Sequence, residues 1–252
     1  MASLAKITEH LASFLHPNDI PDYPGAHNGL QLENRSGEVN KVAAAVDATL
    51  PVIKEAADAG VDLLIVHHGM FWGGAKPITG AHFEKLKVAM DANLAIYSSH
   101  IPLDVHPDLG NNALLCKALG ILDPTPFMPW KGIMIGLKSE SQLTRRELIT
   151  RLENVVGGPV NVCRGGEKAA GTVGVITGGA GSMVEDAVAE GIDTFITGEG
   201  PHHSFTTAEE LGLNVLYGGH YATETFGVKA LASHLASAFS LKSIFIDHPT
   251  GL

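Results

Sequence analysis

Imidazoles and carboxylates follow three short apolar runs of this sequence, at the point where each run ends. The runs are LLIV, LAIYSS and NVLYGG. The carboxyl ends of parallel strands meet at one edge of a sheet, and ligands bind there. The residues that we expect to lie together at this edge are His67, His68, His100, Asp104, His220 and Glu224.

The types and spacing of these residues favour a site for two cations. Adjacent histidines in extended backbone point to opposite sides, so His67 and His68 suit two neighbouring metals better than one. His220 and Glu224 are four residues apart on one face of a predicted helix, and a carboxylate there can bridge two cations about 3.5–4 Å apart. Imidazole and carboxylate ligands suit zinc, iron or manganese. Without a thiolate, nothing indicates a closed structural zinc site.

Short apolar strands alternate with helical patterns along the chain, which is typical of an α/β fold with largely parallel sheets. In the first part we predict strands at 41–46, 63–66 and 94–98, and helices at 3–15, 50–59, 81–92 and 111–119. In the second part we predict strands near 133–137, 172–177, 194–197, 214–217 and 243–247, and helices near 144–155, 182–190, 205–211 and 222–238.

A proline-rich segment separates the two parts. Residues 123–132, DPTPFMPWKG, carry three prolines and a glycine and give the strongest linker signal of the chain. We therefore expect two α/β lobes. The first comprises residues 1–126 with about 218–252 and carries most of the metal ligands, and the second comprises residues 127–217.

The two lobes contain similar segments at an offset of 131 residues. KVAAAVDATLPVIKEAADAGVDLLIVHHG aligns with GTVGVITGGAGSMVEDAVAEGIDTFITGE, so that Gly60 falls on Gly191 and Asp62 on Asp193. A duplication explains this match. So does the general need of a β–α–β unit for a glycine before an apolar strand. Either explanation predicts two lobes of similar construction.

Composition excludes several classes of protein. The chain has 252 residues, 17 Lys and Arg against 27 Asp and Glu, a net charge of −10 and 13 histidines. Such an acidic surface repels phosphate backbones, so we expect no nucleic-acid partner. No apolar run approaches the roughly 20 residues that span a membrane, and the N-terminus resembles an amphipathic helix rather than a secretion signal. Two cysteines cannot build a disulfide framework, which favours a cytoplasmic protein.

Other residues near these strand ends have alternative interpretations. His100 could orient a ligand or transfer protons as a catalytic group, or it could be a structural histidine. Asp47 and Glu199 could each orient a ligand or cap a helix. The loop histidines His202 and His203 could reach the site. The loop TGGAGS at 177–182 could cradle a phosphate, and Phe71 and Trp72 could stack on a base or pack in the core or a subunit interface.

Five motifs, in their order and spacing, resemble the NIF-three-like dinuclear-metal family, whose members are often called GTP cyclohydrolase 1 type 2. The motifs are HNGLQLE, IVHHGMFWGG, YSSHIPLDVHPDLGNNALL, FITGE and GGHYATETFGVKAL. The resemblance extends from about residue 5 to 248, and the length resembles the short bacterial form. The sequence is looser at Tyr221, where some relatives have histidine, and around GEGPHH.

The resemblance implies a two-lobed protomer of a toroidal homohexamer, with two divalent metal ions in each subunit. Carried over by motif, His68 and Asp104 bind one metal, His67 and His220 bind the other, and Glu224 binds both. The family name implies a GTP cyclohydrolase, that is, water attack on a purine ring.

Two functions of different classes follow. The first is a metal-dependent hydrolase that acts on a nucleotide-like small molecule, with His100 moving protons. The alternative is a non-catalytic ring that stores, delivers or scaffolds metal. Both predict the same metal ligands, and they differ in whether a substrate pocket adjoins the metals.

Overall fold

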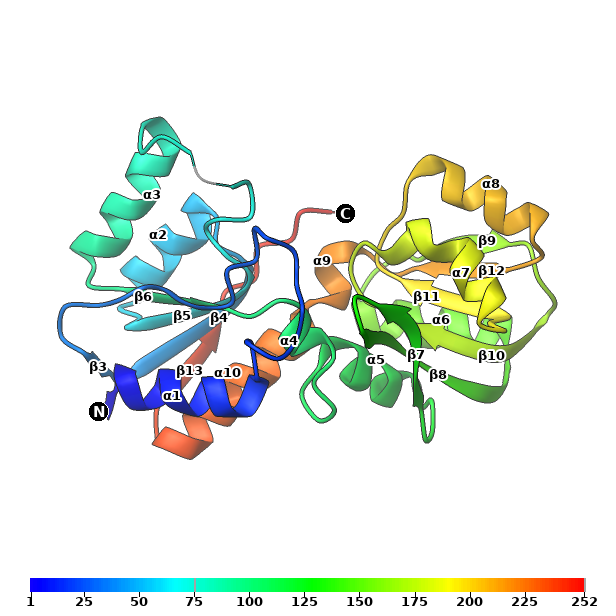
Figure 1. Cartoon of the computed structure of the whole chain (residues 1–252), viewed down its shortest axis with the longest axis horizontal. Helices are drawn as coiled ribbons and strands as arrows, with labels where there is room; N and C mark the ends of the chain where they lie inside the picture. Colours follow the sequence, from blue (N-terminus) through cyan, green and yellow to red (C-terminus); the bar gives the residue numbers. More distant parts are fainter. Residues whose placement is uncertain (75, 252) are drawn as a thin grey trace. The chain divides into compact units, whose positions relative to one another are not determined.

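A computed structural model describes residues 1–74 and 76–251 of the chain. The chain divides into two compact units. Unit 1 comprises residues 1–103 and 227–248, and unit 2 comprises residues 104–226 and 249–252. Each unit is built on its own mixed sheet with helices against it (Figure 1). The α/β class expected from the sequence is confirmed.

Unit 1 contains a five-stranded sheet in the order β13-β4-β5-β6-β2. Its strands are parallel except β2, which runs antiparallel to β6. A small antiparallel pair, β1 and β3, precedes β4. The elements of unit 1, including two helices that extend across its boundaries, are β1 (Ala2–Ser3), α1 (Leu4–Leu15), β2 (Gly29–Leu32), β3 (Glu38–Val39), β4 (Lys41–Asp47), α2 (Leu50–Asp58), β5 (Leu63–His68), α3 (Gly80–Asp91), β6 (Ala95–Ser98), α4 (Ile101–Asp104), α10 (Thr225–Phe239) and β13 (Lys242–Phe245).

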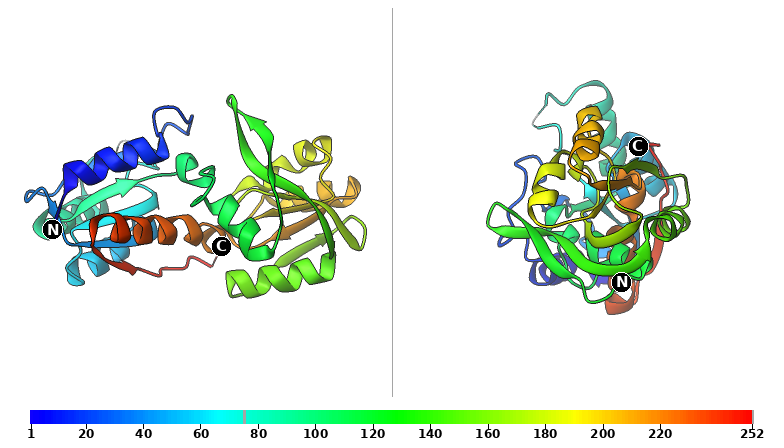
Figure 2. Two further views of the ribbon diagram at one scale, coloured as in Figure 1. Left: turned by 90° about the horizontal axis from the view of Figure 1, so that it is seen from below. Right: turned by 90° about the vertical axis from the view of Figure 1, so that its right-hand side faces the viewer.

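Helices cover both faces of this sheet, α2 and α3 on one side and α1 and α10 on the other (Figures 1 and 2). Leu64 and Val66 of β5 pack in one apolar cluster with residues of α2 and α3. Leu63 and Ile65 are equally buried and point to the opposite face. Burial on both faces explains why these strands are continuously apolar.

Unit 2 contains a six-stranded sheet in the order β7-β8-β10-β11-β12-β9. Only the β10–β11 and β11–β12 pairs are parallel; the other pairs are antiparallel. The elements of unit 2 are α5 (Asn111–Leu119), β7 (Thr125–Trp130), β8 (Ile133–Thr144), α6 (Arg145–Val156), β9 (Asn161–Arg164), β10 (Ala169–Val175), η1 (Ala180–Met183), α7 (Val184–Ala189), β11 (Thr194–Thr197), α8 (His202–Glu210), β12 (Asn214–Tyr217) and α9 (His220–Thr223).

The second sheet is also covered on both faces. Phe195 and Val215 belong to a cluster with residues of α7 and α8. Their neighbours Ile196 and Leu216 belong to a cluster with residues of α5 and α6. The alternation along β11 and β12 places one apolar cluster on each side of the sheet.

The proline-rich segment is not a linker. Residues 125–130 form β7, an edge strand that pairs with β8. The boundaries of the two units also differ from the expected 126 and 218. Residues 104–124 belong to unit 2 because Leu115 and Leu119 of α5 pack with α6, and Phe226 packs against the same cluster. The expectation of largely parallel sheets holds for unit 1 and is wrong for unit 2.

Among residues 1–74 and 76–251, no helix has the length and apolar character needed to cross a membrane.

Candidate metal-binding residues

Two adjacent histidines form the end of β5 in unit 1. The strand continues through His67 and His68 and does not stop at Val66 as the sequence indicated. His68 lies opposite Asp47 in the parallel register with β4, and the Ala48 N–H donates to its carbonyl oxygen. His67 is fully buried, whereas the His68 side chain is 13% exposed. Strand pairing therefore holds the backbone of both residues in place.

The rings of these histidines converge. We expected them to point to opposite sides, but their centroids are only 4.8 Å apart. Nδ1 of His67 lies 3.0 Å from the carbonyl oxygen of Ser99, and Nδ1 of His68 lies 2.9 Å from Oδ1 of Asp47. Because these oxygens accept hydrogen bonds, each Nδ1 carries a proton, and Nε2 is the ring nitrogen through which a metal would bind. This tautomer is the one that metal-bound histidines adopt.

His100 joins the histidine pair. Its ring centroid is 4.7 Å from that of His67 and 5.5 Å from that of His68. One ring nitrogen from each of the three residues lies within 4.8 Å of the other two. Three converging imidazoles are a donor set that zinc, iron and other divalent transition metals accept. His67 and His68 therefore supply donors of the kind that a metal ion needs, and His100 lies beside them.

Sequence reasoning missed the residues that hold His100. Nδ1 of His100 lies 2.8 Å from Oδ1 of Asp22, and both side chains are 8% exposed. Asp22 also accepts hydrogen bonds from Asn28 Nδ2 and the Ile101 N–H, and the His100 N–H donates to Asn28 Oδ1. Burial raises the pKa of Asp22, but the hydrogen bonds from His100 and Asn28 outweigh it and hold the pKa below its ordinary value. The HNGLQLE motif contains Asn28, and this was the only signal of the network.

In unit 2, His220 lies between two carboxylates. Its Nδ1 is 2.9 Å from Oε1 of Glu199, at the end of β11, and its Nε2 is 3.1 Å from Oε1 of Glu224. Burial acts against a charged imidazole, but the hydrogen bonds and charges of Glu224 and Glu199 outweigh it and raise the pKa of His220 to about 9. At neutral pH the ring is therefore protonated, and a metal at Nε2 would replace that proton.

The glycine-rich loop 177–182 makes room for Glu224. Gly178 has φ +70°, and a Cβ there would clash with Oε1 of Glu224. The loop does not cradle a phosphate with the N–H groups of Gly178, Ala180 and Gly181, because these donate within the protein to Thr223, Thr197 and Glu199. The packing of Glu224 therefore explains this loop better than a phosphate site does.

Asp104 is held within unit 2. Its Oδ1 accepts a hydrogen bond from Asn111 Nδ2 at 2.7 Å, and Thr177 Oγ1 lies 3.5 Å from the same oxygen. Asp104 is 9% exposed. The carboxylate is therefore buried and fixed in direction, as a metal ligand needs to be.

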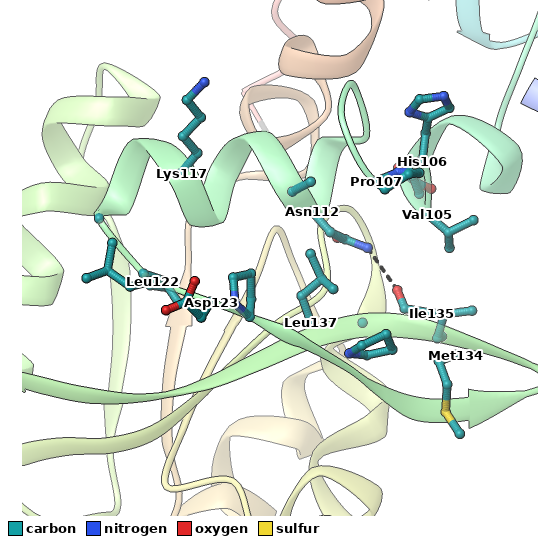
Figure 3. A pocket seen from close by; sticks show the side chains of 17 residues that line it. Val105, His106, Pro107, Asn112, Lys117, Leu122, Asp123, Met134, Ile135 and Leu137 are labelled. Atoms are coloured by element: carbon teal, nitrogen blue, oxygen red, sulfur yellow. Dashed lines mark hydrogen bonds between the residues drawn. The ribbon is translucent and has the colours of Figure 1, made fainter. Parts of the chain in front are cut away.

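A cavity of about 540 Å³ borders Asp104 and lies between α5 and β8. Figure 3 shows Val105, His106 and Pro107 at one end of it and Leu122 and Asp123 at the other. Asn112 is satisfied within the protein, because its Nδ2 donates to the carbonyl oxygen of Ile135 (Figure 3). The lining is mainly apolar, so the cavity suits an apolar group better than a phosphate.

His202 and His203 start α8 and are exposed. Within the part of the chain that the structure describes, neither belongs to a group of three or more metal-ligating side chains whose donor atoms lie within 4.8 Å of one another. The structure therefore gives these two helix residues no place among the metal-binding candidates.

Comparison with known proteins identifies relatives over the whole chain. The family model Duf34/NIF3 (NGG1p interacting factor 3) matches residues 2–251. The chain is 41% identical over 255 residues to a GTP cyclohydrolase 1 type 2 homolog of Pyrococcus abyssi, covering 97% of this chain and 99% of that protein. It is 39% identical over 249 residues to a protein of the same name from Deinococcus radiodurans, covering 98% and 94%.

Solved structures show the same relationship. The crystal structure of a Thermus thermophilus protein matches with a TM-score of 0.88 and 38% identity, covering 100% of both chains. A family model that spans nearly the whole chain and relatives of this identity and coverage leave one conclusion. The chain belongs to the Duf34/NIF3 family.

Proposed function

We propose that the protein is a metal-dependent hydrolase that acts on a nucleotide-like small molecule, with GTP as the first candidate substrate. The metal ligands in this proposal are those implied by the family resemblance. His68 and Asp104 hold one divalent ion, His67 and His220 hold a second, and Glu224 contacts both. The relatives named GTP cyclohydrolase 1 type 2 homolog support GTP cyclohydrolase chemistry.

One observation carries the proposal. His67, His68 and His220 each have Nδ1 within 3.0 Å of an oxygen acceptor. A histidine whose Nδ1 donates to an oxygen is fixed in its ring orientation and binds a metal through Nε2, which in His220 means that the metal would replace the proton shared with Glu224. A structural histidine needs no such uniform pattern. Its recurrence at three strand ends supports metal binding in both units.

Divalent ions at these residues, when bound, supply Lewis acidity that activates water near neutral pH and polarises the bond under attack. Residues of the chain supply proton transfer and orientation. His100 Nε2 accepts or delivers a proton, since Asp22 holds its Nδ1 in hydrogen-bond distance. Asp22 stays ionised because its pKa is lowered, so it orients the ring without taking the proton. His100 is therefore the proposed catalytic residue.

The proposal is tested by metal analysis of gently purified protein together with a turnover assay on a nucleotide panel that includes GTP. About two metals per chain and turnover of a ring-bearing nucleotide are expected. His100→Gln should keep the metal content and lower kcat, whereas His82→Gln, at a partly buried position of α3, should change neither. Two metals without turnover of any nucleotide would exclude the hydrolase on this panel and favour metal storage or delivery. Loss of metal in His100→Gln would make His100 a ligand.

The assembly and compartment follow from the same proposal. The family resemblance supports a homohexameric ring, which light scattering of the purified protein tests: a monomer at micromolar concentration would contradict it. The cytoplasm is the proposed compartment because Cys116 and Cys163 are buried free thiols, as is typical of a reducing environment. Burial raises the pKa of Cys116 to about 12, so this thiol is not a nucleophile.

A further inference from the structure

Two half-exposed aromatic side chains lie beside the histidines of unit 1. Tyr23 is 49% exposed and Trp72 is 42% exposed. The Trp72 ring centroid is 4.5 Å from that of His100 and 5.1 Å from that of His68, and the Tyr23 centroid is 6.0 Å from that of His100. Large aromatic side chains are usually buried for most of their area, so two exposed ones next to candidate metal ligands need a reason.

The two rings form a corner. Their centroids are 6.1 Å apart and their planes meet at 69°. Neither ring lies flat on the other, because the contact is edge to face. Trp72 also meets His100 edge to face, at 63°. Both rings remain close to half exposed in this arrangement, and another flat ring stacks on an aromatic face.

Hydrogen bonds hold the two segments that carry the corner. Oδ1 of Asp22 accepts from the Tyr23 N–H at 2.6 Å. Gln31 joins the segments, since its Nε2 donates to the carbonyl oxygens of Ala26 and His27 while its Oε1 accepts from the Met70 N–H at 2.7 Å.

The backbones of these segments are also in close contact. A Cβ at Gly25 would lie 2.7 Å from the carbonyl oxygen of Trp72, so only glycine permits this approach. The corner is thus built before any ligand arrives, which lowers the entropic cost of binding.

We propose that Tyr23 and Trp72 form a stacking site for the planar heteroaromatic ring of the substrate. This inference rests on the proposed hydrolase and names where its substrate binds. A ring stacked in the corner would lie next to the imidazoles of His68 and His100, where the proposed chemistry takes place. Aromatic side chains bind purine and related rings through their faces with little demand on the ring's substituents. The site therefore selects flat rings as a class.

The test measures binding without turnover. The chain contains two tryptophans, so Trp130→Phe leaves Trp72 as the sole indole fluorophore. In this metal-loaded background, guanosine 5′-monophosphate is titrated against ribose 5-phosphate, which has the same sugar and phosphate and no ring. The nucleotide should quench Trp72 fluorescence saturably, and ribose 5-phosphate should not. Equal quenching by both would place recognition on the sugar phosphate and overturn the proposal.

Matched variants separate the ring from the rest of each side chain. By calorimetry, Tyr23→Leu and Trp72→Leu should each weaken nucleotide binding roughly tenfold or more, as expected for a lost stacking face. Tyr23→Phe and Trp72→Phe keep a ring and should retain most of the affinity. Metal content should stay the same in all four variants. Unchanged affinity in both leucine variants would exclude the stacking site.

These results are distinct from those that decide the hydrolase. Ring-dependent binding without turnover of any nucleotide would contradict the proposed hydrolase and support the stacking site. Turnover with an unchanged KM in both leucine variants would contradict the stacking site and support the hydrolase.

Discussion

The two β–α–β segments at the centres of the two sheets have the same construction and end differently. In unit 1, β4 and β5 are parallel neighbours joined through α2; in unit 2, β10 and β11 are parallel neighbours joined through η1 and α7. Both helices are followed by a left-handed glycine, Gly60 with φ 63° and Gly191 with φ 77°. The repeat at an offset of 131 residues is therefore also a repeat of backbone geometry.

In both segments an aspartate just before the second strand accepts a hydrogen bond from a backbone N–H of the first strand. Oδ2 of Asp62 accepts from the Lys41 N–H at 3.0 Å, and Oδ2 of Asp193 accepts from the Thr172 N–H at 2.8 Å. Lys41 and Thr172 are themselves 131 positions apart. The match thus reaches individual hydrogen bonds, which a general need for a glycine before a strand does not explain.

The strand ends differ in the chemistry that they supply. β5 ends in His68, whereas the corresponding residue after β11 is Glu199. In unit 1 a carboxylate at the end of β4, Asp47, orients the histidine of β5. In unit 2 the carboxylate Glu199 follows β11, and it orients His220, which comes from after β12. The comparison teaches that packing constrains the β–α–β segment while the residues at its strand ends vary: the position of the candidate metal ligand His68 carries an orienting carboxylate, Glu199, in unit 2, and the position of Asp47 carries Gly178.

The largest effect is expected at Glu224, the carboxylate that the proposal places on both metals. Glu224→Ala should reduce the metal content from about two per chain to nearly none, because both ions lose a ligand. Plasma mass spectrometry of the gel-filtered protein measures this. Glu210→Ala, at the exposed end of α8, is the matched control and should keep both metals. One metal retained in Glu224→Ala would show that Glu224 does not contact both ions.

A smaller effect is expected at the orienting carboxylates, and it tests whether the two units use them equivalently. Asp47→Asn and Glu199→Gln should each lower metal affinity about 10- to 100-fold, the usual cost of losing a group that orients a ligand. Competition with a chromogenic chelator gives the affinity. An effect in only one of the two variants would mean that the carboxylates have different roles in the two units.

Asp62 and Asp193, which hold the strands of the two β–α–β segments together, should affect stability rather than metal content. Asp62 accepts from two backbone N–H groups, those of Asn40 and Lys41, and is partly buried. Asp62→Ala should therefore lower the free energy of unfolding by about 2 kcal/mol, as expected for hydrogen bonds to a charged group. Asp193 is exposed, so Asp193→Ala should cost about 1 kcal/mol. Urea unfolding of the two variants measures the difference, and a larger loss at Asp193 would contradict this ranking.

The sequence predicted buried elements well because their signals are local. Strands 194–197 and 214–217 and the helix 111–119 have the bounds expected from apolar runs and flanking turns. β7 was missed because three prolines and a glycine in 123–132 resemble a linker. It lies at a sheet edge, where a strand tolerates the missing N–H of proline.

The candidate site was predictable only where its residues follow strands. His67 and His220 carry such a signal. Asp22 does not, because its partner His100 is 78 residues away in the chain and only tertiary contact brings them together. Nor does adjacency of His67 and His68 show that their rings converge, since extended backbone alone points them apart.

A similarly small effect is expected at the two left-handed glycines, where the repeat predicts equal behaviour. Apart from the adjacent residues of the chain, a Cβ at Gly60 or Gly191 would meet no atom within 4 Å, so substitution strains only the backbone. Gly60→Ala and Gly191→Ala should therefore each cost about 1–2 kcal/mol, as expected for a left-handed conformation of an L-residue. Thermal unfolding of the metal-loaded protein compares them, with Gly158→Ala as a control that has space and an ordinary φ. Equal losses of stability would support a common construction of the two β–α–β segments, because the strain would then depend only on the left-handed turn that both contain. A loss of stability in only one variant would mean that the turn at the other glycine can relax. The similarity of the two segments would then be limited to their backbone hydrogen bonds.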